Sequence, residues 1–265
     1  MSSKPKGRSY ISGTPIAWIA AYGALVGVTS FVPLLPYPGG NGYWPLAVVL
    51  ASVGPLILGP IPGFISAFVG GLIGMFIAPG AYPLGIFDAF QVATLPAIMV
   101  GLTLNAGPKK WVALYAAVLA IATVSFYVVL FVYPCVPCLS GGWSPIDPTQ
   151  YALVILYFWL LPAIVMLSPL GTKYIYNSVR GSNTTKRFIG LFLGTWMGFN
   201  LWYLTPTYWS FWIIYQYPSA LLYFQALFVY TWYMPLFAIL VTIIAAPIAT
   251  ALGKSGMAKP PNVIW

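Results

Sequence analysis

Residues 62–78 read PGFISAFVGGLIGMFIA, and this stretch decides the class of fold. It carries no charged side chain, and between Arg8 and Lys109 the only charged residue is Asp88. Over the whole chain 60% of the residues are apolar and 5% are charged, which is far from the balance of a water-soluble protein. Apolar segments of this kind can cross a hydrocarbon core of ~30 Å. The sequence therefore predicts an all-α integral membrane protein.

Outward from this stretch, apolar segments alternate with turn-rich or basic loops, which predicts about eight transmembrane helices, with six to eight as the range. Segments 45–59 and 62–78 form either two thin spans or a re-entrant hairpin, and both choices return the chain to the same side. The predicted spans are 15–35, 45–59, 62–78, 85–104, 111–133, 151–169, 188–204 and 220–252.

The basic residues predict which side of the membrane each loop occupies. Eleven Lys and Arg stand against two acidic residues, and the cations lie in four short clusters. With eight crossings and the N-terminus inside, all four clusters face the cytoplasm, as the positive-inside rule expects. Cations scattered between apolar spans do not form a nucleic-acid surface. The clusters are Lys4, Lys6 and Arg8; Lys109 and Lys110; Lys173, Arg180, Lys186 and Arg187; and Lys254 and Lys259.

This topology predicts a multi-pass protein of the cell membrane with both ends in the cytoplasm. The lipid bilayer is its first partner, and other membrane subunits are expected beside it. The predicted parts are an N-terminal tail (1–14), a first membrane half (15–105), a second membrane half (106–252) and a C-terminal tail (253–265).

The inventory of side chains excludes several kinds of chemistry. The chain has no histidine, and its only acidic side chains are Asp88 and Asp147. Histidine-ligated haem, di-iron carboxylate sites and histidine-based triads are therefore ruled out within this chain. We predict no metal site, no cofactor and no catalytic residue, so the chain is not expected to be an enzyme.

One pair of residues keeps an enzymatic alternative open. Cys135 and Cys138 are spaced as in a redox-active disulfide and lie in a predicted outer loop. The loop resembles the first cysteine pair of bacterial disulfide-generating membrane oxidoreductases, but the second pair and the basic residue at the quinone are missing. A structural disulfide or free thiols is the favoured interpretation, and a membrane thiol oxidoreductase is the alternative.

The two halves of the chain resemble each other. Five residues recur without a gap at one constant offset, and the matched helices would run in the same direction. This pattern predicts a parallel repeat of four plus four helices, although Gly, Phe and Ile are common enough here to match by chance. The matches are Phe64, Ile65, Phe68, Gly70 and Gly74 with Phe188, Ile189, Phe192, Gly194 and Gly198.

A few polar residues within the apolar spans are candidates for binding a small molecule. A carboxylate near the start of a membrane helix, such as Asp88, is a functional candidate because burying it unpaired is costly. The alternative is that Asp88 complements the helix dipole. The remaining candidates could equally make hydrogen bonds between helices or serve as an interfacial anchor. The candidate substrate-binding residues are Trp44, Asp88, Gln91, Asn200 and Gln225.

Three patterns in the first part of the chain carry a family resemblance. They are an Ala-xxx-Ala spacing in the first helix (Ala17 with Ala21, Ala20 with Ala24), the run LILGPIPG at 56–63 that leads to Ala78-Pro79, and GIFD at 85–88 that leads to Val100-Gly101. From 17 to 104 the chain resembles the substrate-binding S component of energy-coupling-factor vitamin transporters. The resemblance implies that Ala17, Ala20, Ala21 and Ala24 dock on a membrane partner, and that the outer parts of the helices bind a vitamin or metal.

Two functions are therefore expected ahead of the oxidoreductase. The first is a small-molecule-binding transport component without its own ATPase, with an outward pocket that Asp88 or Gln91 reaches. The second is a non-catalytic structural or accessory subunit of a larger membrane complex.

Overall fold

A computed structural model describes residues 9–37, 42–132, 153–154, 156–203 and 225–265. The all-α class predicted from the sequence is confirmed. Among the described residues, three helical runs are long and apolar enough to cross a membrane, and a bent pair adds a fourth. Eight spans are not shown. The runs are Pro60–Ile77, Ile86–Asn105 and Ala226–Lys254, and the pair is Leu156–Leu167 with Leu170–Arg180, bent by 67°.

The surface of the described part is compatible with a lipid surround. Large apolar side chains lie on it in both parts of the chain: Phe76 is 79% exposed and Trp232 is 72% exposed. Exposed apolar area on this scale is unfavourable in water and neutral in hydrocarbon.

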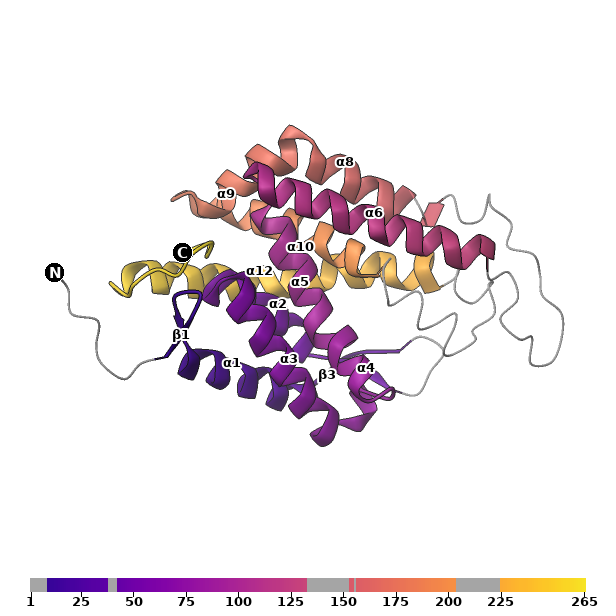
Figure 1. The fold of residues 1–265 in the computed structure, drawn as a ribbon, viewed down its shortest axis with the longest axis horizontal. Coiled ribbons are helices and arrows are strands. Elements are labelled where there is room, and N and C mark those ends of the chain that lie inside the picture. The colour runs from indigo at the N-terminus through magenta and orange to yellow at the C-terminus, as the bar shows by residue number, and fades with distance from the viewer. Residues whose placement is uncertain (1–8, 38–41, 133–152, 155, 204–224) are drawn as a thin grey trace. The chain divides into compact units, whose positions relative to one another are not determined.

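The chain divides into two compact units (Figure 1). Unit 1 comprises Met1–Gly101 and Ile243–Trp265, and unit 2 comprises Leu102–Thr242. The boundaries fall inside two helices, α5 (Leu95–Asn105) and α12 (Thr231–Lys254).

Unit 1 is built on a pair of adjacent helices, α1 (Ile16–Val28) and α3 (Pro60–Ile77), with α2 (Ala47–Leu58) packed on α3 (Figure 1). Two short antiparallel sheets, which the sequence did not predict, flank α1. The other elements are β1 (Tyr10–Ile11), β2 (Thr14–Pro15), η1 (Thr29–Phe31), β3 (Pro33–Pro36), β4 (Tyr43–Pro45), η2 (Pro79–Ala81), α4 (Ile86–Asp88) and η3 (Ala89–Thr94).

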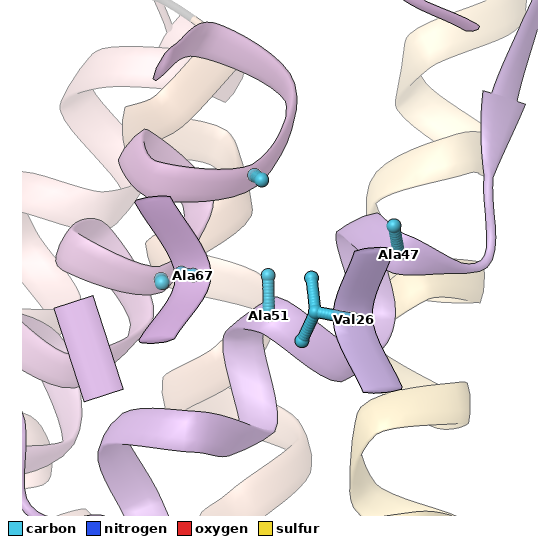
Figure 2. Packing of buried hydrophobic residues seen from close by; sticks show 6 residues of the cluster. Val26, Ala47, Ala51 and Ala67 are labelled. Atoms are coloured by element: carbon cyan, nitrogen blue, oxygen red, sulfur yellow. The ribbon is translucent and has the colours of Figure 1, made fainter. Parts of the chain in front are cut away.

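Small side chains make the core of unit 1. Val26, Ala51 and Ala67 bring α1, α2 and α3 together (Figure 2). A Cβ on Gly63 would collide with the backbone of Pro55, so only glycine permits this approach of α3 to α2. The cluster consists of Val26, Ala47, Ala51, Ala67, Ala93 and Ala97, with Tyr22, Leu50 and Phe64 around it.

The turn between α2 and α3 depends on Gly59, whose φ of 95° favours glycine. The last carbonyls of α2 have no partner within their own helix, and both ends of the described chain supply donors to them. The bonds are Thr14 Oγ1 to Leu58 O (2.6 Å), Trp265 Nε1 to Ile57 O (2.8 Å) and Ile264 N to Leu56 O (3.0 Å). Residues 263–265, within the predicted C-terminal tail, are therefore buried in unit 1.

Unit 2 is a set of helices around α10 (Thr184–Trp202), which packs on α8 (Leu161–Leu167) and α9 (Tyr176–Arg180). The sharp bend follows Ser168, whose extended backbone precedes Pro169. Residues 171–187 are predicted to form a cytoplasmic loop, but 171–180 and 184–187 are helical. The other elements are α6 (Lys109–Val132), η4 (Leu156–Leu160), η5 (Leu170–Ile175) and η8 (Gln225–Tyr230).

Three π-helical segments, η3, η4 and η8, lie shortly before a proline inside a helix, namely Pro96, Pro162 and Pro235. Proline has no N–H and its ring clashes with the carbonyl four residues earlier, so wider turns accommodate it. At Pro235 the carbonyl released in this way is that of Thr231. The Tyr157 hydroxyl donates to that carbonyl at 3.0 Å.

Candidate functional site

Asp88 is placed by the turn that opens α4. Gly85, at φ 61°, reverses the chain just before this helix. Asp88 is only 4% exposed, and its Oδ2 accepts a hydrogen bond of 2.6 Å from the Leu84 amide. The hydrogen bond ties the carboxylate to the turn before the helix, and a carboxylate in the first helical turn complements the helix dipole. Asp88 therefore has a structural role, and it remains the only acidic side chain of unit 1.

Gln91 follows on η3, which packs on α2 and α3 and leaves its side chain 3% exposed. Asp88 and Gln91 thus lie one turn apart inside the apolar part of unit 1. Single π-helical turns inside α-helices often occur at functional sites, which makes this the most site-like part of the helix.

The hairpin of β3 and β4 closes this end of unit 1 with aromatic residues. Trp44 is 1% exposed and meets the Tyr37 ring edge-on, with centroids 4.7 Å apart. The Tyr37 hydroxyl donates to the Ala81 carbonyl at 2.8 Å, and the Tyr43 hydroxyl donates to the Ser30 carbonyl at 3.1 Å. This end of unit 1 therefore has a packed, hydrogen-bonded aromatic cover, made of Tyr37, Tyr43 and Trp44.

Tyr82 connects this cover to Asp88. Its hydroxyl lies 2.9 Å from Ser30 Oγ. Burial raises the pKa of Tyr82 to about 12, and the nearby Asp88 carboxylate adds to the increase. The hydroxyl is thus protonated at neutral pH and stays in the hydrogen-bonded cover. Trp44, Asp88 and Gln91 share this end of unit 1, but the side chains are buried rather than arranged around a described cavity.

The other two predicted binding residues belong to unit 2. Asn200 is fully buried, and its Nδ2 donates to the Tyr157 carbonyl at 3.2 Å. Its Oδ1 has no hydrogen-bond partner among the described residues. Gln225 begins η8, and its side chain lies outside the described part of the chain. The five candidates are therefore divided between the units and are not shown to form one site.

Helix α1 carries two sets of small residues, glycines and alanines, and the two sets differ in burial. Gly23 and Gly27 are buried against α3, where a Cβ would lie 3.0 Å from the Ser66 carbonyl oxygen and 2.6 Å from Ile73 Cγ2 respectively. The alanines of α1 lie outside this buried face. The four predicted docking residues, Ala17, Ala20, Ala21 and Ala24, are all exposed.

The cysteine pair, Cys135 and Cys138, lies outside the described residues. Within the described ranges no group of three His, Cys, Asp or Glu side chains could hold a metal ion.

Unit 2 contains a cavity that the sequence does not predict. It has a volume of about 520 Å³ and lies between η5–α9 and the start of α10. Lys173 and Lys186 line it, together with the polar side chains of Tyr174, Asn177, Ser182 and Asn183. The sequence signal of this cavity is the density of cations from 173 to 187, which by itself predicts only membrane topology.

Comparisons of the chain with protein-family models, with curated proteins and with solved structures found no match.

Proposed function

We propose that this chain is a multi-pass membrane component, without catalytic activity or an ATPase of its own, that docks on another membrane protein through the alanine face of α1. The supporting observation is that the glycines of that helix are buried against α3 while its alanines are exposed. In lipid, helices associate through close packing, and small residues allow their backbones to approach. The glycine face already serves α3, whereas Ala17, Ala20, Ala21 and Ala24 remain available to a partner helix.

The docking proposal is tested by native mass spectrometry of the chain purified from its own membranes in mild detergent. The wild type should carry a membrane protein at a fixed ratio, and the double variant Ala20→Leu/Ala24→Leu should lose it because leucine side chains hold the helices apart. Ala113→Leu/Ala117→Leu is the matched control, since both alanines are exposed on α6. A wild type that is purely monomeric, or a partner retained by the α1 variant, would refute the proposal.

We further propose that the component binds a small molecule beside Asp88 and Gln91, as an S component would. This is supported by a buried carboxylate in a unit that has no other acidic side chain, next to a π-helical turn. Native mass spectrometry should find a bound small molecule that Asp88→Asn releases while the partner protein stays attached. If Asp88→Asn keeps the small molecule at full occupancy, Asp88 has only a structural role.

The closed aromatic cover favours a second candidate, the non-catalytic structural or accessory subunit. Trp44 is 1% exposed and Tyr37 and Tyr43 are hydrogen-bonded within the cover, so a ligand would have to displace packed rings. In this case the partner protein copurifies with the chain and no small molecule does.

We also propose a topology for the chain, with eight membrane crossings and both ends in the cytoplasm. It is supported by the bonds from Thr14 and Trp265 to the same end of α2, because these place both ends of the described chain on one side of unit 1. Amine labelling of sealed cells should leave Lys109, Lys173 and Lys254 unmodified, and labelling of any of them from outside would overturn the topology.

A further inference from the structure

The basic cavity of unit 2 is formed by a bend and a turn. The 67° bend at Ser168–Pro169 redirects η5 and α9, and the chain then turns at 181–183 into α10. The two walls therefore come from consecutive segments, with Lys173 on the first and Lys186 on the second. The volume of about 520 Å³ is within the range of small-ligand sites.

The two arginines of this region are engaged by the protein itself. Arg180 donates to the Leu104 carbonyl at 2.9 Å and to Asn105 Oδ1 at 2.7 Å, and its guanidinium lies 4.0 Å from the Tyr176 ring centroid. Arg187 donates to the Gly181 carbonyl at 2.7 Å. Two lysines, rather than these arginines, therefore supply the positive charge that faces the cavity.

The described part of unit 2 offers these lysines no counter-charge, because it contains no Asp or Glu. The start of α10 increases this excess of positive charge. Its first turn holds Lys186 and Arg187 and no acidic residue, although the N-terminus of a helix favours negative charge. Asn183 Oδ1 caps the helix by accepting from the Lys186 amide at 2.9 Å. The positive end of this helix adds to the field of both lysines, so an anion is the ligand that the cavity favours.

Exposed apolar side chains close in sequence to the two cavity lysines indicate what carries the anion. Leu170 is 43% exposed and lies three residues before Lys173, and Ile189 is 40% exposed and lies three residues after Lys186. Phe188 is exposed beside it. Each cavity lysine thus has an exposed apolar neighbour about one helical turn away. A phosphate that carries acyl chains would bind the lysines through its charge and contact the apolar side chains through its chains.

We propose that the cavity binds the phosphate headgroup of an anionic phospholipid, held between Lys173 and Lys186, with the acyl chains lying over Leu170, Phe188 and Ile189. Asn177, Tyr174 and Ser182 supply neutral hydrogen-bond donors to the phosphate oxygens. The described part of unit 2 has no acidic side chain to pair with these lysines, and an anionic membrane provides the missing charge.

The test uses the full chain in detergent, titrated with phosphatidylglycerol or phosphatidylcholine and measured by native mass spectrometry. The wild type should bind phosphatidylglycerol preferentially, and Lys173→Gln/Lys186→Gln should weaken that binding by roughly tenfold or more. Lys109→Gln/Lys110→Gln removes the same charge from exposed positions of α6 in unit 2 and should keep the preference. Lys173→Arg/Lys186→Arg should also keep it.

Three outcomes would overturn the proposal. Equal binding of the two lipids by the wild type would exclude headgroup recognition. An equal loss in the α6 control would show that only net charge matters. Displacement of phosphatidylglycerol by excess inorganic phosphate would assign the cavity to a free anion instead of a lipid.

Discussion

The central clusters of the two units are built from side chains of different size. In unit 1 the core is a layer of alanines with Val26, and glycines bring helix backbones into contact. In unit 2 large rings fill the space: Phe199 and Trp202 both pack on Phe237, with ring centroids 5.5 Å and 6.5 Å away. Where glycines bring backbones together there is no room for an added side-chain atom. Where rings fill the core, removing a ring leaves a cavity.

Aromatic side chains make hydrogen bonds in both units. In unit 2 the aromatic residues also carry hydrogen bonds: the Trp196 indole donates to the Tyr157 hydroxyl at 3.1 Å, and that hydroxyl donates to the Thr231 carbonyl. In unit 1 the helix ends are satisfied by residues far away in the sequence, such as Trp265. The comparison teaches that small residues bring helices together and that aromatic residues connect helices that stay further apart.

Removing an aromatic ring from the core of unit 2 should have the largest effect on stability. Phe237→Ala leaves a cavity among fully buried rings, and the free energy of unfolding should fall by about 3–5 kcal/mol. Titration with SDS in mixed micelles measures it. Trp232→Ala, on the same helix but 72% exposed, should change it little. Equal effects of the two variants would mean that the ring cluster does not stabilise unit 2.

Adding one methyl group to unit 1 should have the next largest effect. Gly63→Ala places a Cβ against the Pro55 backbone, which cannot move aside as a flexible side chain can, so we expect a loss of about 1–3 kcal/mol. Gly253→Ala is the control, because a Cβ there meets nothing within 4 Å. If the two variants unfold at the same SDS concentration, close packing is not what holds α2 to α3.

The smallest loss of stability is expected from a substitution of Trp265. Trp265→Phe keeps a buried ring but removes the N–H that donates to the Ile57 carbonyl, so stability should fall by about 0.5–1.5 kcal/mol. Hydrogen exchange at the α2–α3 turn should increase in this variant and remain unchanged in Trp232→Phe. Unchanged exchange in Trp265→Phe would show that the C-terminal residues rest on unit 1 without stabilising it.

The sequence predicts which residues could form a site, but not how they are arranged in space. Asp88 could be singled out because a carboxylate among apolar residues is rare. Its hydrogen bond to the Leu84 amide depends on the turn at Gly85. The alanines of α1 could be recognised as a small face, but their exposure depends on which side α3 covers. The cavity lysines were visible as cations, and only the bend after Ser168 brings the two walls together.

The sequence by itself determined the helical class and the compatibility with lipid, because apolar length and missing charge are additive properties that require no knowledge of contacts. Tertiary structure alone decided which small residues are buried, where Trp265 binds and how Lys173 and Lys186 come to line one cavity. These depend on contacts between residues distant in the chain, and a single sequence carries no direct record of such contacts.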